Sequence, residues 1–166
     1  MSDYALRDGE VALPFDPGTA AFQAGLVFIG RIRSPWTSRE ACPKNMAAAE
    51  AAGGGGRVEI DEAYRPGLEG LAAFSHAIVL SWLDRGPRTL IRQKPRHASR
   101  ASGVFSLRSP LRPNPIGLHV VRIVALDLSA GVLQLAAVDA LDGTPVLDLK
   151  PYHASTDAAP EATRRR

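Results

Sequence analysis

The stretch Gly103-Val-Phe-Ser-Leu-Arg-Ser-Pro-Leu-Arg-Pro-Asn-Pro-Ile-Gly117 decides how the middle of this 166-residue chain can fold. Each of its three prolines fixes φ and removes a backbone donor, so the segment can be neither a helix nor a central strand. We expect a rigid, extended loop that holds Arg108 and Arg112 at a set spacing. The residues Gly103–Leu107 predict a short strand that ends at Arg108. Arginines on a stiff loop indicate recognition of an anion.

A basic segment surrounds this loop. Between Arg85 and Arg112 there are eight Lys and Arg residues and no Asp or Glu, whereas the rest of the chain has 12 basic and 17 acidic residues. A local basic surface indicates a phosphate-bearing partner, and a solvated charge run is the alternative reading. We predict that nucleic-acid phosphate is contacted by Arg88, Arg92, Lys94, Arg96, Arg100 and Arg112.

Length and composition limit the class of protein. The chain is long enough for one domain with a substantial core. It has no run of 18 apolar residues, and its first residues lack the apolar core of a signal peptide, so we expect a soluble, cytoplasmic protein without a membrane span. The single cysteine, Cys42, excludes an intrachain disulfide and a cysteine metal cage. The four histidines are scattered, which favours structural roles, and no metal site is predicted.

The pattern of short apolar runs predicts a mainly β fold, a compact antiparallel β-barrel or a sandwich with short helical segments. Residues 1–25 are expected to be an N-terminal arm or strand, residues 26–152 the folded domain, and residues 153–166 a C-terminal tail. Met46–Ala52 predicts a helix, and the glycines of Gly53–Gly56 predict a flexible joint after it. The expected strands are 26–33, 57–60, 76–83, 103–107, 119–128, 132–141 and 145–149.

Polar residues follow several of these strands. Strand-end loops are where functional sites are usually built. Neither a Walker A sequence nor the strand–GxGxxG–helix unit of a dinucleotide site occurs. The remaining candidates supply carboxylates, guanidinium groups and backbone donors that could hold an adenosyl ligand: Pro43-Lys44-Asn45, Asp84-Arg85, Arg108 and Asp142-Gly143-Thr144-Pro145.

Five motifs resemble the TsaA-like, or TrmO, family. They are Ile29-Gly-Arg-Ile-Arg-Ser-Pro35, Cys42-Pro-Lys-Asn45, Gly70-Leu-Ala-Ala-Phe-Ser-His76, the Gly103–Gly117 stretch, and Leu141-Asp-Gly-Thr-Pro-Val-Leu-Asp-Leu-Lys-Pro-Tyr152. The likeness runs from about Ile29 to Asp157. It implies a methyltransferase that uses S-adenosylmethionine and acts on tRNA, at N6 of the threonylcarbamoyladenosine next to the anticodon.

The resemblance also implies an antiparallel β-barrel that works as a homodimer, with the cofactor near the subunit interface. Carried over by motif, the residues that would bind S-adenosylmethionine are Pro43, Lys44, Asn45, Asp84, Arg85, Arg108, Leu118, Asp142, Gly143, Thr144 and Pro145.

The implied chemistry asks for a proton acceptor, because the lone pair of a carbamoylated N6 is delocalised and makes this nitrogen a poor nucleophile. Asp139 and Tyr152 are the candidate catalytic residues by position, and Asp142 is a third. A strand-facing Asp139, a packed Tyr152 and a turn-capping Asp142 are the structural alternatives. Two other functions remain open: a methyltransferase that acts on another RNA or a small molecule, and a non-enzymatic RNA-binding β-barrel.

Overall fold

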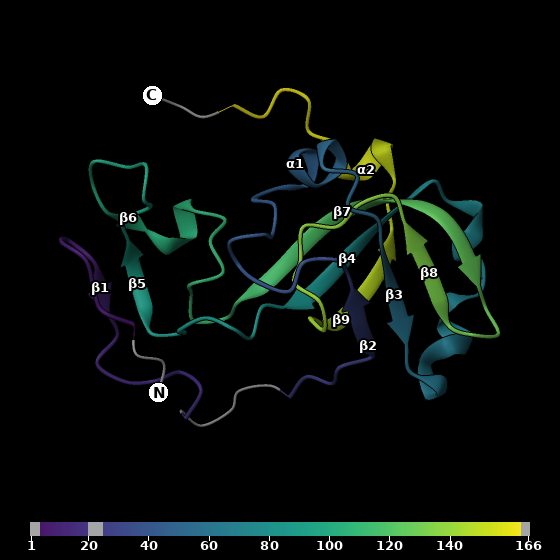
Figure 1. Cartoon of the computed structure of the whole chain (residues 1–166), viewed down its shortest axis with the longest axis horizontal. Helices are drawn as coiled ribbons and strands as arrows, with labels where there is room; N and C mark the ends of the chain where they lie inside the picture. The colour runs from purple at the N-terminus through teal and green to yellow at the C-terminus, as the bar shows by residue number, and fades with distance from the viewer. Residues whose placement is uncertain (1–3, 20–24, 164–166) are drawn as a thin grey trace.

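The computed structural model describes residues 4–19 and 25–163, and the chain is mainly β, with antiparallel sheets and few short helices (Figure 1). The elements are β1 (Val11–Ala12), β2 (Gly30–Arg33), α1 (Met46–Ala51), β3 (Gly56–Ile60), η1 (Glu62–Leu68), η2 (Leu71–Ala73), β4 (His76–Trp82), β5 (Leu90–Gln93), β6 (Ser102–Gly103), η3 (Val104–Ser106), β7 (Ile116–Asp127), β8 (Val132–Leu135), β9 (Pro145–Pro151) and α2 (Ala154–Asp157). None of the helices in this described part has the length and apolar character needed to cross a membrane.

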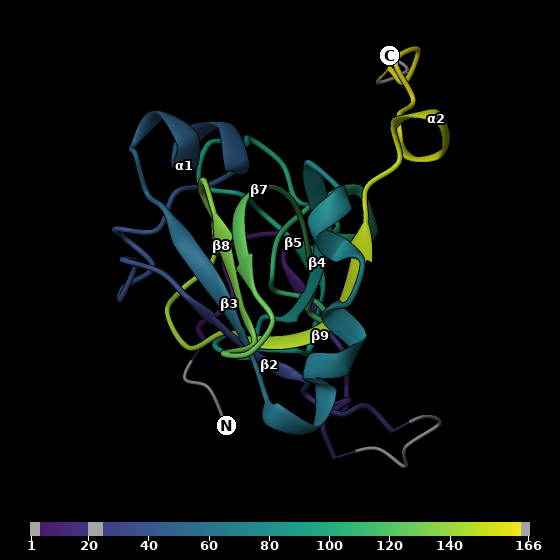
Figure 2. The same ribbon diagram turned by 90° about the vertical axis from the view of Figure 1, so that its right-hand side faces the viewer.

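Six of the strands form one closed sheet. They pair in the order β2-β3-β8-β7-β4-β9, and β9 pairs back to β2, so this ring leaves no unpaired edge (Figure 2). The interior is filled by aliphatic side chains from all six strands, among them the fully buried Ile32, Val58, Val79, Leu133 and Val146. The expected helix at Met46 is confirmed as α1, which begins after Asn45 because the Asn45 side chain accepts a hydrogen bond from the Ala48 amide.

The pairing of β4 with β7 places apolar side chains on both faces of the closed sheet. Inward residues of β4 lie opposite inward residues of β7, including Ser81 opposite Gly117. The outward residues form a second apolar row, which we call the outer ladder: Ile78, Leu80 and Trp82 on β4, opposite Val120, Leu118 and Ile116 on β7. The three β7 members are exposed, and at the end of the ladder the Arg88 guanidinium lies over the Trp82 ring.

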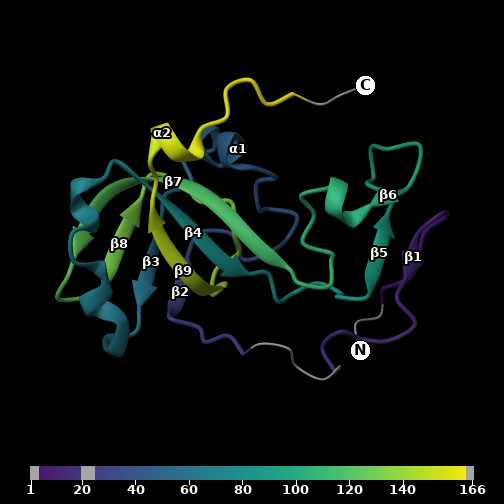
Figure 3. The same ribbon diagram turned by 180° about the vertical axis from the view of Figure 1, so that it is seen from behind.

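The other three strands belong to an extension that lies beside the closed sheet (Figures 1 and 3). The extension consists of β1, β5, β6 and η3, with strand order β1-β5-β6. It has a small core of its own, in which Leu90, Val104 and Leu111 are buried and Tyr4 and Ile91 pack against them. The residues expected to be an N-terminal arm therefore supply one strand and one core side chain to the extension.

A buried carboxylate fixes the N-terminal residues to the extension. The side chain of Glu10 accepts hydrogen bonds from the Tyr4 hydroxyl, the Arg7 amide and guanidinium, and the Lys94 amide at the end of β5. Burial alone would raise the pKa of Glu10, but these four donors outweigh it and lower the pKa to about 2. Glu10 is therefore ionised and joins segments more than 80 positions apart in the sequence.

The prediction of a strand over residues 103–107 is wrong. Only Ser102–Gly103 is a strand, and Val104–Ser106 turns into η3, which leaves Phe105 79% exposed. The Ser106 hydroxyl donates to the Gly103 carbonyl and closes this turn. The guanidinium of Arg112 donates to the carbonyls of Val104, Leu107 and Ser109. In a sheet, such carbonyls would instead accept hydrogen bonds from a neighbouring strand. The proline-rich loop that follows has no regular structure, as its prolines predict.

The prediction of a flexible joint at Gly53–Gly56 is also wrong, because close packing requires small residues there. A Cβ on Gly54 would overlap the indole ring of Trp36, and a Cβ on Gly56 would lie 2.6 Å from Val138 Cγ1. Gly53 follows α1 with φ of +65°, the left-handed conformation that ends many helices. The run thus brings the chain close beneath Trp36, whose Nε1 donates to the Val138 carbonyl at 2.8 Å.

Gly54→Ala is expected to lower the free energy of unfolding by about 1–2 kcal/mol, because the added methyl group must displace the indole of Trp36. Urea denaturation followed by tryptophan fluorescence measures the change. The control is Gly55→Ala, where the nearest atoms are 3.7 Å from the added carbon. Equal effects of the two substitutions would contradict the packing role of Gly54.

Candidate functional site

Two of the predicted motifs meet beyond the end of β4. Arg85, three residues after β4, donates from Nη2 to the carbonyl of Asp142 at 2.7 Å, although the two residues are 57 positions apart. Arg31 on β2 donates to the carbonyl of the next residue, Gly143, at 3.1 Å. We call these four residues the Arg85 cluster. The fold thus brings the Asp84-Arg85 motif and the Asp142–Pro145 turn together.

The Asp142–Pro145 turn is tied to β2 and to the loop after it. The Asp142 carboxylate accepts from the Ser34 amide at 3.1 Å, and the Gly143 amide donates to the Ile32 carbonyl. Thr144 is buried, and its hydroxyl donates to the Leu141 carbonyl at 2.7 Å. Gly143 has φ of +79°, which favours glycine. These contacts give the Asp142 side chain a turn-holding role and fix the backbone that faces Arg85.

A polar cavity of about 610 Å³ borders this turn. Its walls include Asp142, but also three charged residues that the sequence reasoning missed: Arg33, Arg57 and Glu59. The Glu59 carboxylate accepts from Arg33 and from Arg57, at 2.8 Å in each case, and the Arg33 guanidinium, with help from Arg57, lowers the pKa of Glu59. The signal in the sequence was the charged residue at every second position of the β2 and β3 runs. Residues at this spacing lie on one face of a strand, and the pairing of β2 with β3 brings Arg33 opposite Arg57, next to Glu59.

The Pro43-Lys44-Asn45 motif lies in the loop before α1. Asn45 caps the helix, whereas Lys44 is exposed and available to a ligand. Asp139 lies near this loop: burial, together with the negative charge of Asp139, raises the pKa of the Cys42 thiol next to Pro43. The fold therefore brings a candidate catalytic carboxylate close to one of the predicted cofactor motifs.

Asp139→Asn is expected to increase the rate of Cys42 alkylation at pH 8 about two- to threefold, because removing the carboxylate charge lowers the thiol pKa and raises the thiolate fraction. The measurement is iodoacetamide labelling followed by mass spectrometry, which a single cysteine makes unambiguous. Asp61→Asn removes an exposed acid after β3 and serves as control. Identical rates in both variants would show that Asp139 does not influence this loop.

Asp139 and Tyr152 lie in different places. An Asp139 carboxylate oxygen is 2.6 Å from His119 Nδ1, and the His119 ring is inside the closed sheet. The Tyr152 amide donates to the carbonyl of His76, the first residue of β4, whereas Arg85 lies three residues beyond Trp82, the last residue of that strand. Seven β4 residues separate the two ends by ~20 Å. Tyr152 is thus remote from the Arg85 cluster, whereas Asp139 is linked through His119 to Ser81, the next-to-last residue of β4.

Arg108 and Leu118 form a separate pair. Arg108 donates from Nη2 to the carbonyl of Leu118 at 3.1 Å, and Leu118 belongs to the outer ladder. No hydrogen bond among the described residues joins this pair to the Arg85 cluster. The predicted cofactor residues therefore belong to two distinct sets of hydrogen bonds in the single chain.

The predicted nucleic-acid contacts also divide into two groups. Arg88 donates to the Pro113 carbonyl at 2.7 Å and to the Asn114 side chain at 3.3 Å, and its guanidinium lies 5.1 Å from the centre of the Trp82 ring. Arg112 is occupied by the carbonyls of its own loop. Both side chains therefore order the proline-rich loop.

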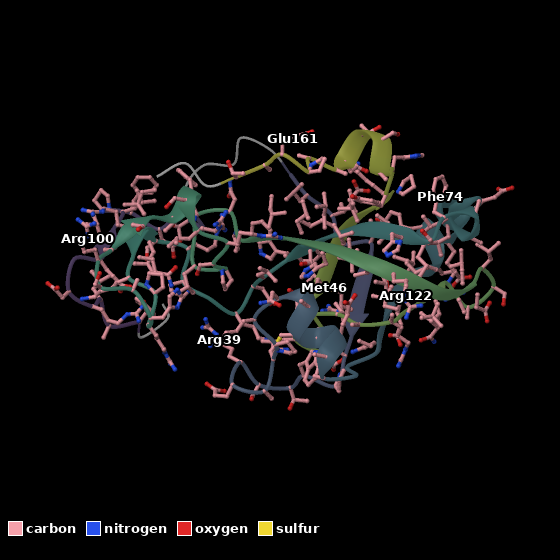
Figure 4. The ribbon with its side chains drawn as sticks, turned by 90° about the horizontal axis from the view of Figure 1, so that it is seen from above. Arg39, Met46, Phe74, Arg100, Arg122 and Glu161 are labelled. Carbon is pink, nitrogen blue, oxygen red and sulfur yellow. The ribbon has the colours of Figure 1, made fainter. Side chains whose placement is uncertain are left out.

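The remaining basic residues lie in the extension. Arg92, Lys94 and Arg100 line a second cavity of about 480 Å³ together with Ser99 and Ser102, and we call it the basic cavity. Arg96 is exposed nearby in the sequence. Asp8 is the one acid in the lining, with a carboxylate oxygen 3.5 Å from Lys94 Nζ. Figure 4 shows Arg100 at one end of the molecule and Phe74 and Arg122 toward the other.

Comparison with known proteins places this fold and these motifs in context. Residues 31–158 match the family described as the tRNA-methyltransferase O N-terminal domain. A chain from Rhizobium radiobacter, named as a probable S-adenosyl-L-methionine-binding protein, VirR, is 37% identical over 152 residues, which are 91% of this chain and 82% of that protein. The tRNA (adenine(37)-N6)-methyltransferase of Escherichia coli is 33% identical over 141 residues, which cover 81% of this chain and 60% of the enzyme.

A solved structure agrees with the sequence match. The crystal structure of TrmO from Pseudomonas aeruginosa superimposes with a TM-score of 0.71 at 34% identity, over 89% of this chain and 62% of that chain. The present chain therefore spans about three-fifths of the length of the E. coli enzyme and of this crystal structure.

Proposed function

Because the chain belongs to the family of TrmO N-terminal domains, we propose that it is an S-adenosylmethionine-dependent methyltransferase that acts on tRNA. The proposed acceptor is N6 of the threonylcarbamoyladenosine next to the anticodon. Relatives named as S-adenosyl-L-methionine-binding proteins support the cofactor, and the relative named as a tRNA (adenine(37)-N6)-methyltransferase supports the substrate. The observation that carries the proposal is the hydrogen bond between Arg85 and Asp142, which assembles two family motifs at one place.

The side chains near the Arg85 cluster fit this cofactor. S-adenosylmethionine has a carboxylate, an ammonium group, ribose hydroxyls and an adenine edge, and it supplies a methyl group on a sulfonium. Arg85 is exposed and keeps donors for a carboxylate beyond the one used on Asp142, and the exposed Asp84 can accept from hydroxyl or ammonium groups. The residues proposed to hold the cofactor are Pro43, Lys44, Asn45, Asp84, Arg85, Arg108, Leu118, Asp142, Gly143, Thr144 and Pro145.

Proton transfer is assigned to Asp139. Its side chain is 17% exposed, so one carboxylate can be buried against His119 and still reach a ligand. A positioned carboxylate that accepts the N6 proton restores the lone pair that the carbamoyl group delocalises. Tyr152, at the opposite end of β4, is left with a packing role beside His76.

The basic cavity and the exposed Arg96 form the proposed contact with the tRNA backbone. Three cationic side chains and two hydroxyl groups around one hollow suit a phosphate group. Arg88 and Arg112 contribute by fixing the loop between the extension and the closed sheet. Binding through phosphate contacts weakens as salt rises, so a steep dependence of tRNA affinity on salt is expected.

The outer ladder is the proposed dimer interface, with a second copy of the chain as its occupant. Six adjacent apolar side chains on a sheet face are typical of a protein–protein contact. The face is bordered by Asp148 and Lys150 of β9, which form an ion pair with each other at 2.6 Å and so give the apolar row a charged rim. Leu118 lies on this face, so the Arg108–Leu118 pair would complete a cofactor site near the interface. Sedimentation equilibrium tests the dimer.

The same proposal covers the organisation of the chain. The closed sheet serves as a compact β-barrel within residues 26–152. Of the arm proposed for residues 1–25, the described residues 4–19 complete the extension, and of the tail proposed for residues 153–166, residues 153–163 are described. The site of action is the cytoplasm, where tRNA is modified.

The test has two steps. Calorimetric titration with S-adenosylmethionine is expected to give a Kd of about micromolar strength, roughly −8 kcal/mol. Transfer of a labelled methyl group is then measured on tRNA with and without threonylcarbamoyladenosine. Transfer to the modified tRNA alone supports the full proposal, whereas transfer to other RNA supports a different acceptor. Absence of cofactor binding would overturn the proposed enzymatic activity and favour the alternative of an RNA-binding protein.

A further inference from the structure

Three polar side chains form a continuous hydrogen-bonded chain inside the closed sheet. Ser81 Oγ on β4 lies 2.8 Å from His119 Nε2 on β7, and His119 Nδ1 lies 2.6 Å from Asp139 Oδ1 in the loop after β8. Ser81 is fully buried, and His119 is 4% exposed. These residues lie 20 and 38 positions apart, so only the folded chain brings them together.

The acceptor at one end sets the direction of this chain. An ionised carboxylate can only accept, so Asp139 fixes the proton of His119 on Nδ1. In the neutral ring Nε2 is then an acceptor, and the Ser81 hydroxyl donates to it. Every polar atom of the imidazole is therefore satisfied, and the ring cannot rotate without losing a bond.

The backbone of β7 makes room for this arrangement. A Cβ at Gly117 would overlap Ser81 Oγ and would lie 2.8 Å from His119 Nε2. The glycine that ends the proline-rich stretch is thus required by the Ser81–His119 contact. A hydrophobic residue at position 119 would pack against the neighbouring core more simply, so the buried polar chain needs a reason other than filling space.

Solvent exposure tells which end can act on a ligand. The same three residue types serve hydrolases, but there the serine must reach the substrate. Here the serine is the fully buried end and the carboxylate is the partly exposed end. In the described part of the chain, the second carboxylate oxygen of Asp139, Oδ2, receives no hydrogen bond, and Asp139 lies near the loop of Cys42 and Pro43.

We propose that His119 and Ser81 are positioning residues that hold Asp139 with Oδ2 directed at the acceptor nitrogen. This inference rests on the proposed methyl transfer. Asp139 Oδ2 takes the proton of N6, the N–H electron pair stays on nitrogen and forms the bond to the methyl carbon, and the carbon–sulfur pair leaves with the thioether. The protonated carboxyl returns its proton to water after product release. Orientation of the carboxylate by a buried ring keeps its basic oxygen at the acceptor throughout the step.

The experiment begins with the free protein. Long-range proton–nitrogen NMR is expected to show His119 as the Nδ1–H tautomer with a strongly downfield Nδ1 proton. Asp139→Asn should move that proton upfield, and Ser81→Ala should shift the Nε2 resonance alone. A wild-type His119 in the Nε2–H tautomer would overturn the inference without any reference to catalysis.

Steady-state kinetics with S-adenosylmethionine and modified tRNA complete the test. Asp139→Asn is expected to lower kcat by about 10²–10⁴-fold. His119→Gln should lower kcat by about tenfold or more and Ser81→Ala by severalfold, and KM for both substrates should stay unchanged in all three variants. Ser75→Ala is the matched control, since Ser75 Oγ lies 2.9 Å from His76 Nδ1 in an exposed pair without a carboxylate, and kcat should not change. Thermal melting verifies that the variants fold, and Ser81→Ala is the variant to use if His119→Gln does not.

The two proposals fail in different ways. Wild-type protein without turnover overturns the proposed function and this inference with it. If the wild-type protein is active and both His119→Gln and Ser81→Ala keep its kcat, the inference alone is overturned. The Ser81–His119–Asp139 hydrogen bonds would then serve only the structure of the core. A rise in KM with unchanged kcat also overturns it, because the residues would then serve binding.

Discussion

Replacement of Arg85 with alanine is expected to weaken binding of S-adenosylmethionine by about 10- to 100-fold, which corresponds to the ~1.5–3 kcal/mol of a hydrogen bond from a charged donor. Arg85 has two functions in the proposed site. It offers guanidinium donors to the ligand, and its bond to the Asp142 carbonyl holds the two loops together. The substitution removes both without touching the core, since Arg85 is exposed.

Calorimetric titration measures the loss, and Arg122→Ala is the control. Arg122 is also an exposed arginine, but it lies on β7 opposite His76, at the other end of β4 from Arg85. The control variant removes the same charge and should bind as the wild-type protein does. If Arg85→Ala keeps the wild-type Kd and melting temperature, the cofactor is not held at the Arg85 cluster.

Glu10→Gln is expected to lower the free energy of unfolding by about 2–4 kcal/mol at neutral pH. The carboxylate is inaccessible to solvent and accepts hydrogen bonds from four donors. The single amide oxygen of glutamine can accept from only some of these donors. The affected contacts join the N-terminal residues to β5, so amide hydrogen exchange at Lys94 should report the loss most directly. Asp8→Asn, on a neighbouring carboxylate that is 96% exposed, should have almost no effect.

The pH dependence of this effect follows from the lowered pKa. A carboxylate whose pKa is about 2 when folded and 4.5 as its ordinary value stabilises the folded state fully above pH 4.5, and the contribution is lost as pH falls toward 2. Urea denaturation of wild type and Glu10→Gln should therefore differ most above pH 4.5 and converge near pH 2. A difference that does not shrink on acidification would mean that the charge of Glu10 is not what stabilises the extension.

The sequence was sufficient for the fold class because the strands of the closed sheet alternate with a period of two, most clearly in β4. It also placed the proline-rich loop correctly, since proline acts locally. It failed at residues 103–107, where alternation suggests a strand but Arg112 satisfies the carbonyls from outside the run. It also missed β5 inside the basic segment, because β5 pairs with β1, some 80 positions away.

The candidate site shows the same division between local and distant information. The motifs that meet at Arg85 and Asp142 could be predicted because each carries a recognisable run of residues. The Ser81–His119–Asp139 chain could not, because three single residues of common types have no local signature. Four scattered histidines look alike in sequence, and only the pairing of β4 with β7 shows that His119 has two polar partners.

The hydrogen bonds from Arg88 to the proline-rich loop have a consequence for which nucleotide of a long RNA would reach the proposed site. The chain leaves the closed sheet after β4 and returns through the loop to β7, and Arg88 on the outgoing segment is bonded to Pro113 and Asn114 on the returning one. Two chain segments cross-linked in this way resist bending more than one segment would. These hydrogen bonds thus hold the basic cavity at a set distance from the closed sheet. An RNA bound at the basic cavity would therefore place at the Arg85 cluster only the nucleotide that lies at the same distance along the strand. The extension would then act as a ruler along the RNA, choosing its target by position as well as by the chemistry of the base.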